Sequence, residues 1–203
     1  MQKTLTRITK ALLSRGFYNH TLHVFDLDDT LLLTKPLVKA AFLQVGVTED
    51  RFNQNWGNAA SMWLTPEIIA QKKVAYESIL KSRSNTPIHT ALNLLANDPN
   101  LRGKVYTLTS ASRYSYELLQ RYVGHLPPLL ASDCQLHAKI SELRKLQMYF
   151  QGNVIYYDDD KQNIETIRQS FHNNPGFKGI LCHFGETVSF TNLSGEGEAA
   201  WTV

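Results

Sequence analysis

Two apolar segments of this chain end in paired aspartates, a residue type that could bind a metal ion there. Asp26 and Asp28 close the run LHVFDLD, and Asp158 and Asp159 follow the run VIYY. Short apolar runs of this kind predict buried strands. Buried carboxylates are costly without a partner, and carboxylate oxygens suit Mg²⁺. We therefore expect a Mg²⁺ site where the two strands end.

The spacing of the first pair supports this interpretation. Side chains two residues apart in a strand share a face, so Asp26 and Asp28 can reach one site while the chain stays extended. In open parallel α/β sheets, ligands bind just beyond the carboxyl ends of the strands. A surface turn rich in aspartate is the alternative for DLDDT alone, but the apolar residues on both sides favour the strand.

A hydroxyl pair and a lysine complete the candidate site. Thr109 and Ser110 follow the β-prone run KVYTL, where a hydroxyl beside the N-terminus of the next helix could bind a phosphoryl oxygen. Either residue could take this role, and we favour Thr109. Lys139 lies near the start of a predicted helix, an unfavourable place for a cation unless it faces an anion. Lys145, further along that helix, is the alternative lysine.

The order of these motifs resembles the haloacid dehalogenase-like (HAD) superfamily of phosphohydrolases. The resemblance covers about residues 22–184 and implies an α/β fold, an HAD-like Rossmannoid three-layer sandwich with a mainly parallel sheet and a small helical cap insertion. The acids at 158–159 are closest to the double-aspartate variant of the fourth motif, although Tyr157 replaces a common glycine and the role of Asp160 stays open. The form YYDDD also faintly resembles HAD domains associated with RNA repair.

The resemblance also implies a mechanism. Asp26 attacks phosphorus to give an aspartyl-phosphate, and Asp28 acts first as acid and then as base. Thr109 or Ser110, together with Lys139, neutralises the phosphoryl oxygens. An aspartate at position 28 favours phosphoryl transfer over dehalogenation, which has no alkoxide to protonate. The implied Mg²⁺ ligands are Asp26, Asp28 through its carbonyl oxygen, Asp158 and Asp159.

The distance between the first two motifs predicts an inserted subdomain. Residues 36–85 are more than a simple crossover needs, and they include the strong helical pattern PEIIAQKKVAYESILKSR. We expect a small helical cap there, with Trp56 and Trp63 as its core; pocket lining or stacking on a base is the alternative role for these two residues. The other predicted parts are an HAD-like core at 21–35 and 86–190, a basic N-terminal segment at 1–20 and a flexible tail at 191–203.

Composition limits the remaining possibilities. The 203 residues, 43% of them apolar, suit one domain with a full core, and no apolar run approaches a membrane span. A net charge of +3 fits an anionic substrate but is too small to indicate nucleic acid. Cys134 and Cys182 lack metal or redox spacing, which favours a reducing compartment. We expect a cytoplasmic protein, or one of the mitochondrial matrix if residues 1–20 are a transit peptide.

These observations lead to one favoured function and several alternatives. We expect a Mg²⁺-dependent phosphatase that acts on a phosphomonoester, such as a phosphorylated small molecule or a nucleotide, with no membrane partner. The alternatives are a phosphatase of nucleotides or nucleic-acid ends, a phosphomutase, and a non-catalytic binding protein on the same scaffold. Of the histidines, only His137 and His183 are expected near the site.

Overall fold

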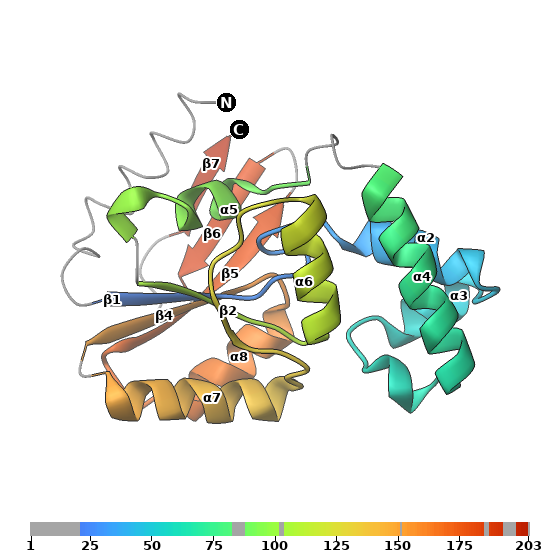
Figure 1. Cartoon of the computed structure of the whole chain (residues 1–203). Coiled ribbons are helices and arrows are strands. Elements are labelled where there is room, and N and C mark those ends of the chain that lie inside the picture. Colours follow the sequence, from blue (N-terminus) through green and yellow to red (C-terminus); the bar gives the residue numbers. More distant parts are fainter. Residues whose placement is uncertain are drawn as a thin grey trace.

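The computed structural model describes residues 21–82, 88–101, 104–150, 152–184, 187–192 and 198–202. Its centre is a sheet with the strand order β3-β2-β1-β4-β5-β6-β7 (Figure 1). The first five strands in this order run parallel, and β6 and β7 add antiparallel pairs. The strands are β1 Thr21–Phe25, β2 Val105–Leu108, β3 Leu129–Ala131, β4 Asn153–Asp158, β5 Phe177–Phe184, β6 Thr187–Asn192 and β7 Glu198–Thr202.

Helices cover both faces of the parallel part, which gives three layers (Figure 1). On one face lie α7 (Leu136–Tyr149) and α8 (Lys161–Ser170); on the other lie α5 (Ala91–Ala96), the 3₁₀ turn η2 (Pro99–Leu101) and α6 (Arg113–Tyr122). Side chains of the central strands alternate between the two cores. Val24 packs on the α7 and α8 side, and the next residue, Phe25, packs on the other side. Burial on both faces explains why these strands are continuous apolar runs in the sequence.

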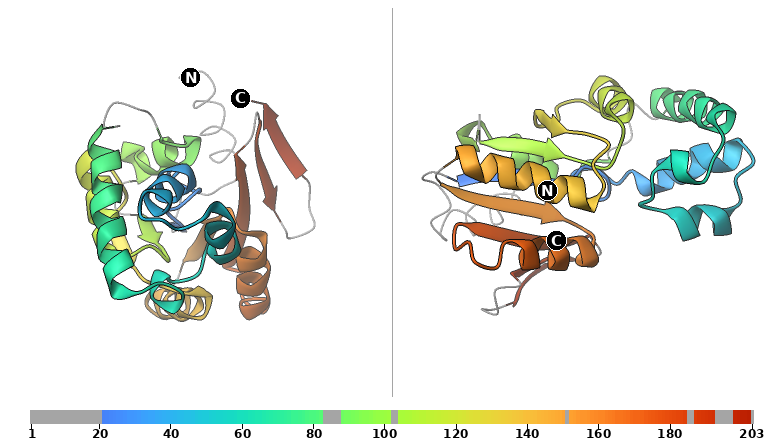
Figure 2. Two further views of the ribbon diagram at one scale, coloured as in Figure 1. Left: turned by 90° about the vertical axis from the view of Figure 1, so that its right-hand side faces the viewer. Right: turned by 90° about the horizontal axis from the view of Figure 1, so that it is seen from below.

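A group of helices that we call the helical insertion, residues 35–82, follows β1. It contains α2 (Lys35–Gln44), α3 (Glu49–Asn55), the 3₁₀ turn η1 (Ala60–Met62) and α4 (Pro66–Ser82). Figure 2 shows it standing at one end of the sheet, beyond the carboxyl end of β1. Its own small core is built on the buried Phe42, Val47, Phe52 and Leu64. Trp56 and Trp63 pack against this core, each within 5.5 Å of a phenylalanine ring between centroids.

Helix α3 lies in a stretch whose polar composition predicts irregular structure. The Thr48 hydroxyl accepts a hydrogen bond from the Arg51 amide, so it caps the helix. Glu49 and Asp50 stand in the first turn, where acids favour a helix N-terminus. Phe52 is the buried residue that attaches the helix to the insertion.

Strands also form within residues 191–203, where the sequence predicts a flexible tail. Residues 191–192 complete β6, which forms where the motif TVSFTNL predicts an edge strand. Strand β7 then pairs antiparallel with β6, with Val188 opposite Trp201. The reason is that β6 alone would leave a row of unpaired backbone groups, which a returning strand satisfies.

Two sequence predictions fall wholly or partly outside the described residues. The N-terminal segment 1–20, interpreted as a helix or a transit peptide, lies outside them, as do residues 83–85 at the end of the predicted cap. Within the described part of the chain, no helix combines the length and the apolar character that crossing a membrane requires.

Candidate active site

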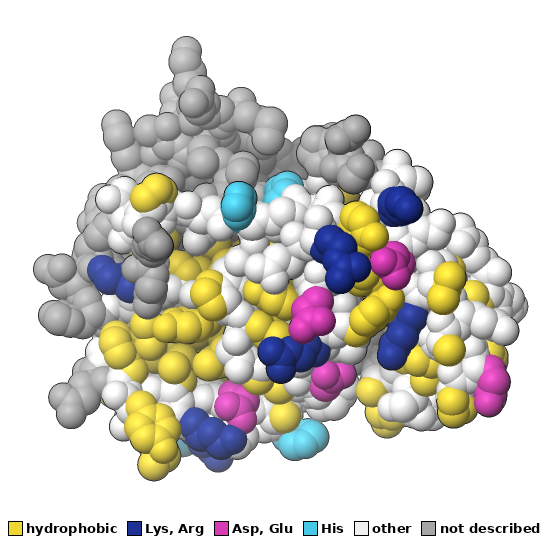
Figure 3. Space-filling model, viewed as in Figure 1, with side chains coloured by type: hydrophobic (Ala, Val, Ile, Leu, Met, Phe, Trp, Pro, Cys, Tyr) yellow, Lys and Arg dark blue, Asp and Glu magenta, His cyan; other side chains and the backbone are white. Residues whose placement is uncertain are grey.

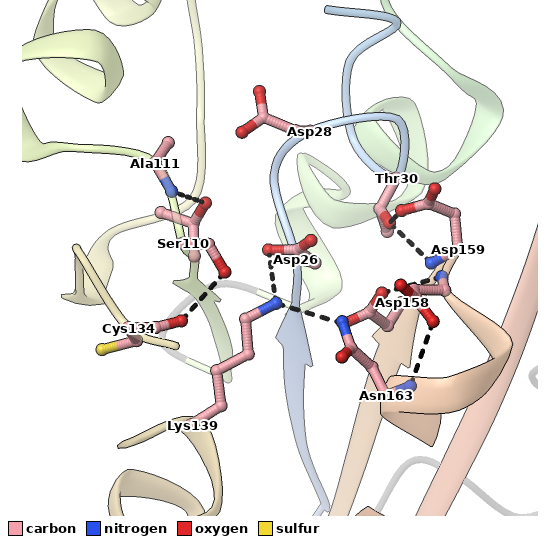
Figure 4. Close-up of polar contacts among 12 residues, drawn as sticks. Asp26, Asp28, Thr30, Ser110, Ala111, Cys134, Lys139, Asp158, Asp159 and Asn163 are labelled. Atoms are coloured by element: carbon pink, nitrogen blue, oxygen red, sulfur yellow. Dashed lines mark hydrogen bonds and ion pairs between the residues drawn. The ribbon is translucent and has the colours of Figure 1, made fainter. Parts of the chain in front are cut away.

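Three carboxylates meet at the carboxyl ends of neighbouring strands. Strands β1 and β4 pair in register, with Phe25 opposite Tyr157, so Asp26 and Asp158 come next to each other in the following position. The Asp26 amide donates to the Tyr157 carbonyl at 2.8 Å, which holds this register at the end of β1. One carboxylate oxygen from each of Asp26, Asp158 and Asp159 lies within 4.8 Å of the others (Figure 4). We call these residues the carboxylate group.

Lys139 bridges two members of this group. Its Nζ lies 3.0 Å from Asp26 Oδ1 and 3.1 Å from Asp158 Oδ2, and the side chain is 1% exposed. Burial opposes the charge of Lys139, but the two carboxylates outweigh burial and raise its pKa above the ordinary value. Lys145 instead lies at the surface and pairs with Glu142 at 2.6 Å. Of the two candidate lysines, the structure therefore brings Lys139 to the acids.

Asp158 is fully buried and is fixed by several donors. The Tyr156 hydroxyl at 2.6 Å and the Asn163 side-chain amide at 3.2 Å donate to Oδ2, and the Asp160 amide donates to Oδ1 at 2.9 Å. The Asp160 side chain itself accepts from the amides of Gln162 and Asn163, at 2.7 and 3.1 Å. Asp160 is thus the N-cap of α8, which answers the question that the triple aspartate left open.

The loop after β1 separates Asp28 from the carboxylate group. Asp29 adopts a left-handed backbone conformation with φ 53°, which turns the chain sharply. The Asp28 carboxylate accepts a 2.5 Å hydrogen bond from Thr34 and lies apart from the other acids (Figure 4). The Thr30 hydroxyl contacts Asp159, the residue after β4. It donates to Asp159 Oδ1 at 3.0 Å and accepts from the Asp159 amide at 3.1 Å.

Burial shapes the protonation of these acids. It raises the pKa of Asp26 well above the ordinary value; Lys139 offsets part of this rise, while Asp158, Asp28 and Asp159 add repulsion. Burial also raises the pKa of Asp28, against the Thr34 hydrogen bond. The pKa of Asp159 rises to about 7, through burial and then repulsion from Asp158. Mutually repelling carboxylates at this spacing fit a hard divalent cation such as Mg²⁺, which would favour their charged forms.

The two hydroxyls at the end of β2 are used differently. The Thr109 hydroxyl is buried and accepts from the Ala111 amide at 2.9 Å, which leaves its own proton available to a ligand. The Ser110 hydroxyl donates its proton to the Cys134 carbonyl at 2.9 Å. Of the two hydroxyls, that of Ser110 is thus occupied as a donor and that of Thr109 acts as an acceptor.

Two residues that contact Asp158 are not among those predicted from the sequence. Tyr156 and Asn163 both donate hydrogen bonds to Asp158, yet the sequence indicates Tyr156 only as a strand residue and assigns Asn163 no role. The position of Asn163, five residues after Asp158 on the next helix, was the one available signal. His137 is exposed on α7, and the side chain of His183 is outside the described residues.

Comparisons with known proteins bear on the fold. No family model and no curated protein matches the sequence. A structure of mutant CbbY from Rhodobacter sphaeroides with xylulose-(1,5)bisphosphate covers 82% of this chain and 87% of its own, with a TM-score of 0.60 and 14% identity. A predicted phosphoglycolate phosphatase from Haemophilus somnus covers 81% and 85%, with a TM-score of 0.51 and 15% identity. A hydrolase from Pseudomonas syringae covers 79% and 82%, with a TM-score of 0.51 and 13% identity.

These similarities, together with the strand order, confirm the predicted fold class. The chain has the HAD-like Rossmannoid fold, with an α/β sandwich around a mainly parallel sheet. At these identities the likeness concerns the fold, so the chemistry has to be argued from the residues of the site.

Proposed function

We propose that this protein is a phosphatase that hydrolyses a phosphomonoester through a phosphorylated Asp26. The observation that carries the proposal is the grouping of Asp26, Asp158, Asp159 and Lys139 at the carboxyl ends of β1 and β4, with a separate acid, Asp28, beside them. A nucleophile, a charge-neutralising group and an independent proton donor are the parts that phosphoryl transfer through a carboxylate requires.

The nucleophile and its support come from two strands and one helix. Asp26 is 7% exposed, so water does not fully solvate its carboxylate and the ion pair with Lys139 holds it in place. Asp26, Asp158 and Asp159 would hold Mg²⁺, which when bound would reduce the repulsion between the nucleophile and an anionic phosphoryl group. Lys139 and the Thr109 hydroxyl would neutralise phosphoryl oxygens, because both are donors fixed by burial.

Asp28 suits the role of acid and base. Its raised pKa favours a proton that could pass to the leaving oxygen. The same carboxylate, once ionised, would take a proton from the water that hydrolyses the phosphorylated Asp26. The hydrogen bond from Thr34 holds the Asp28 carboxylate away from the carboxylate group. Asp28 and the nucleophile Asp26 therefore do not compete for one position.

The site supports a phosphorylated small molecule as the substrate. The CbbY structures contain xylulose-(1,5)bisphosphate or phosphate, which makes sugar phosphates reasonable first substrates to test here. Trp56 and Trp63, the candidates for stacking on bases, are partly buried against the small core of the helical insertion. On the face in Figure 3, acidic and basic side chains are interspersed rather than gathered into a basic surface. Activity on nucleic-acid ends and a cytoplasmic location both stay predictions.

The test is phosphate release from a panel of phosphomonoesters with Mg²⁺ or with EDTA. The panel should include an aryl phosphate, sugar phosphates, nucleotides and a 3′-phosphorylated oligonucleotide. We expect Mg²⁺-dependent turnover that Asp26→Asn abolishes while the far-ultraviolet circular dichroism stays unchanged. Asp160→Asn is the matched control, since asparagine keeps the capping oxygen of α8. Turnover that survives in Asp26→Asn would refute the proposed nucleophile.

A further inference from the structure

Lys72, in the helical insertion, is a partly buried lysine without an ion-pair partner among the described residues. Lys72 lies half-buried on α4, with its Nζ 5.0 Å from the ring centroid of Phe42 and 5.5 Å from that of Tyr76. Among the ion pairs of the described residues, none includes Lys72. Burial lowers the pKa of Lys72, and the more distant charge of Asp28 offsets only part of this. A partly desolvated ammonium over aromatic rings is well placed to receive an anion.

A second unpartnered group lies one helical turn away. Tyr76 is 1% exposed, and its hydroxyl makes no hydrogen bond within the described residues. Residues four apart share a face of a helix, so Tyr76 and Lys72 lie side by side on α4. Burial and then the charge of Asp28 raise the pKa of Tyr76, so its hydroxyl keeps the proton that it could donate. A buried polar atom without a partner is unfavourable unless a ligand satisfies it.

The charge of Asp28 affects the pKa of both Lys72 and Tyr76. Asp28 is the acid that lies apart from the carboxylate group (Figure 4). In the proposed function, Asp28 protonates the leaving oxygen. The remainder of the substrate must therefore extend past Asp28, on the side where the helical insertion stands (Figure 2). Lys72 and Tyr76 lie on that side, with the ring of Phe42 as an apolar floor beneath the ammonium.

We propose that Lys72 and Tyr76 bind a second anionic group, a carboxylate or a phosphate, carried by the leaving-group part of the substrate. This inference rests on the proposed phosphatase function and narrows its substrate class to phosphomonoesters with a further negative charge. The ammonium supplies the charge, and the phenol supplies a directed hydrogen bond to the same anion. Both are specificity-determining groups, because neither lies among the residues that would touch phosphorus.

The experiment compares substrate pairs that differ only in the second anion. Phosphoglycolate and ethyl phosphate form the carboxylate pair; 1,3-propanediol bisphosphate and propyl phosphate form the phosphate pair. For the wild-type protein we expect kcat/KM to favour the doubly anionic member of at least one pair, and the preferred pair identifies the anion. In Lys72→Met this preference should fall by about tenfold to a hundredfold, the range for a hydrogen bond to a charged group.

Three further variants separate this role from others. Lys72→Arg should restore part of the preference, because it keeps the charge. Tyr76→Phe should lower the preference without destabilising the fold, because the hydroxyl bonds to none of the described residues. Lys73→Met removes the neighbouring charge from the exposed side of the same helix and should keep the wild-type preference. An equal loss on both members of each pair in Lys72→Met would overturn the proposal and show that Lys72 acts only through Asp28.

A binding measurement distinguishes failure of this inference from failure of the phosphatase proposal. If the wild-type protein turns over no ester, both members of each substrate pair are titrated calorimetrically into the Mg²⁺-loaded protein. A preference for phosphoglycolate or for 1,3-propanediol bisphosphate that Lys72→Met removes would uphold the second anion site and reject the phosphatase. No preference for either doubly anionic ligand, in turnover or in binding, would reject the second anion site.

Discussion

Replacing Asp159 with asparagine is expected to stabilise the metal-free protein, and more strongly as pH rises. Burial and the charge of Asp158 raise the pKa of Asp159 to about 7 from the ordinary 3.8. A raised pKa means that folding favours the protonated carboxyl. The stability from that proton is full below the unfolded pKa and is lost as pH rises through about 7. Asparagine stays neutral throughout this range.

The magnitude follows from the shift of the pKa. A rise of roughly three units, at about 1.4 kcal/mol for each unit, corresponds to about 4 kcal/mol near pH 8 and to about 1.7 kcal/mol near pH 5. The Thr30 hydroxyl donates to Asp159 Oδ1, and the side-chain oxygen of asparagine can accept the same bond. The substitution therefore removes the charge without removing this contact.

The assay is urea unfolding with EDTA at these two pH values, followed by circular dichroism. The free energy of unfolding of Asp159→Asn should exceed that of the wild type by about 2 to 3 kcal/mol more near pH 8 than near pH 5. Mg²⁺ should stabilise the wild type and have less effect on the variant, because only the folded wild type offers the complete carboxylate group. Asp160→Asn is the control, since it changes the neighbouring aspartate and keeps the helix cap.

Two results would refute this reasoning. One is an unfolding curve of Asp159→Asn that coincides with the wild type near pH 8 in EDTA. The other is a stabilisation that is the same near pH 5 and near pH 8, since a charge that titrates with a raised pKa must produce a pH-dependent difference.

Three further predictions concern single contacts. Lys139→Met leaves Asp26 and Asp158 buried without their cation; we expect turnover to be impaired and the free energy of unfolding in urea to fall by about 3–5 kcal/mol. Lys145→Met should change neither turnover nor the free energy of unfolding. If Lys145→Met impaired both and Lys139→Met impaired neither, the role would belong to Lys145. Glu77→Ala removes the acceptor of the Tyr114 and Tyr122 hydroxyls, both at 3.1 Å, which link α4 to α6. Thermal unfolding should show that the free energy of unfolding falls by about 1 kcal/mol, and hydrogen exchange should show faster opening of α4. Unchanged hydrogen exchange in α4 would contradict the link between α4 and α6. Tyr76→Phe should raise the free energy of unfolding in urea by about 1 kcal/mol, because it removes a buried hydroxyl that bonds to none of the described residues. A lower free energy of unfolding would show that the hydroxyl does have a hydrogen-bond partner.

The predictable part of this structure is the part that depends on local sequence. Asp26 and Asp158 were found because each ends an apolar run, and a parallel sheet brings such ends together. The sequence does not separate Lys139 from Lys145, since both lie on α7. Only the packing of that helix on the sheet decides which one reaches Asp26. For the same reason, the sequence alone does not assign Asp160 to the helix cap rather than to the site.

Contacts between distant segments account for what the sequence left out. Lys72 lies in a strongly helical pattern that indicates nothing about Asp28, because their proximity depends on where the helical insertion stands over β1. Strand β7 forms because β6 offers it an open edge, a condition that its own Gly- and Glu-containing surroundings do not reveal. The hydrogen bond from Thr30 to Asp159 likewise joins residues that are far apart in the chain.

Trapping the phosphorylated enzyme is the most direct test of the central claim that Asp26 is the nucleophile. Borohydride added during turnover with Mg²⁺ reduces an acyl phosphate to an alcohol, so a phosphorylated aspartate becomes homoserine, which peptide mass spectrometry can locate. We predict homoserine at position 26, formed only when Mg²⁺ and substrate are both present. Homoserine at position 28 or 159, or steady turnover without any homoserine, would contradict the proposed mechanism.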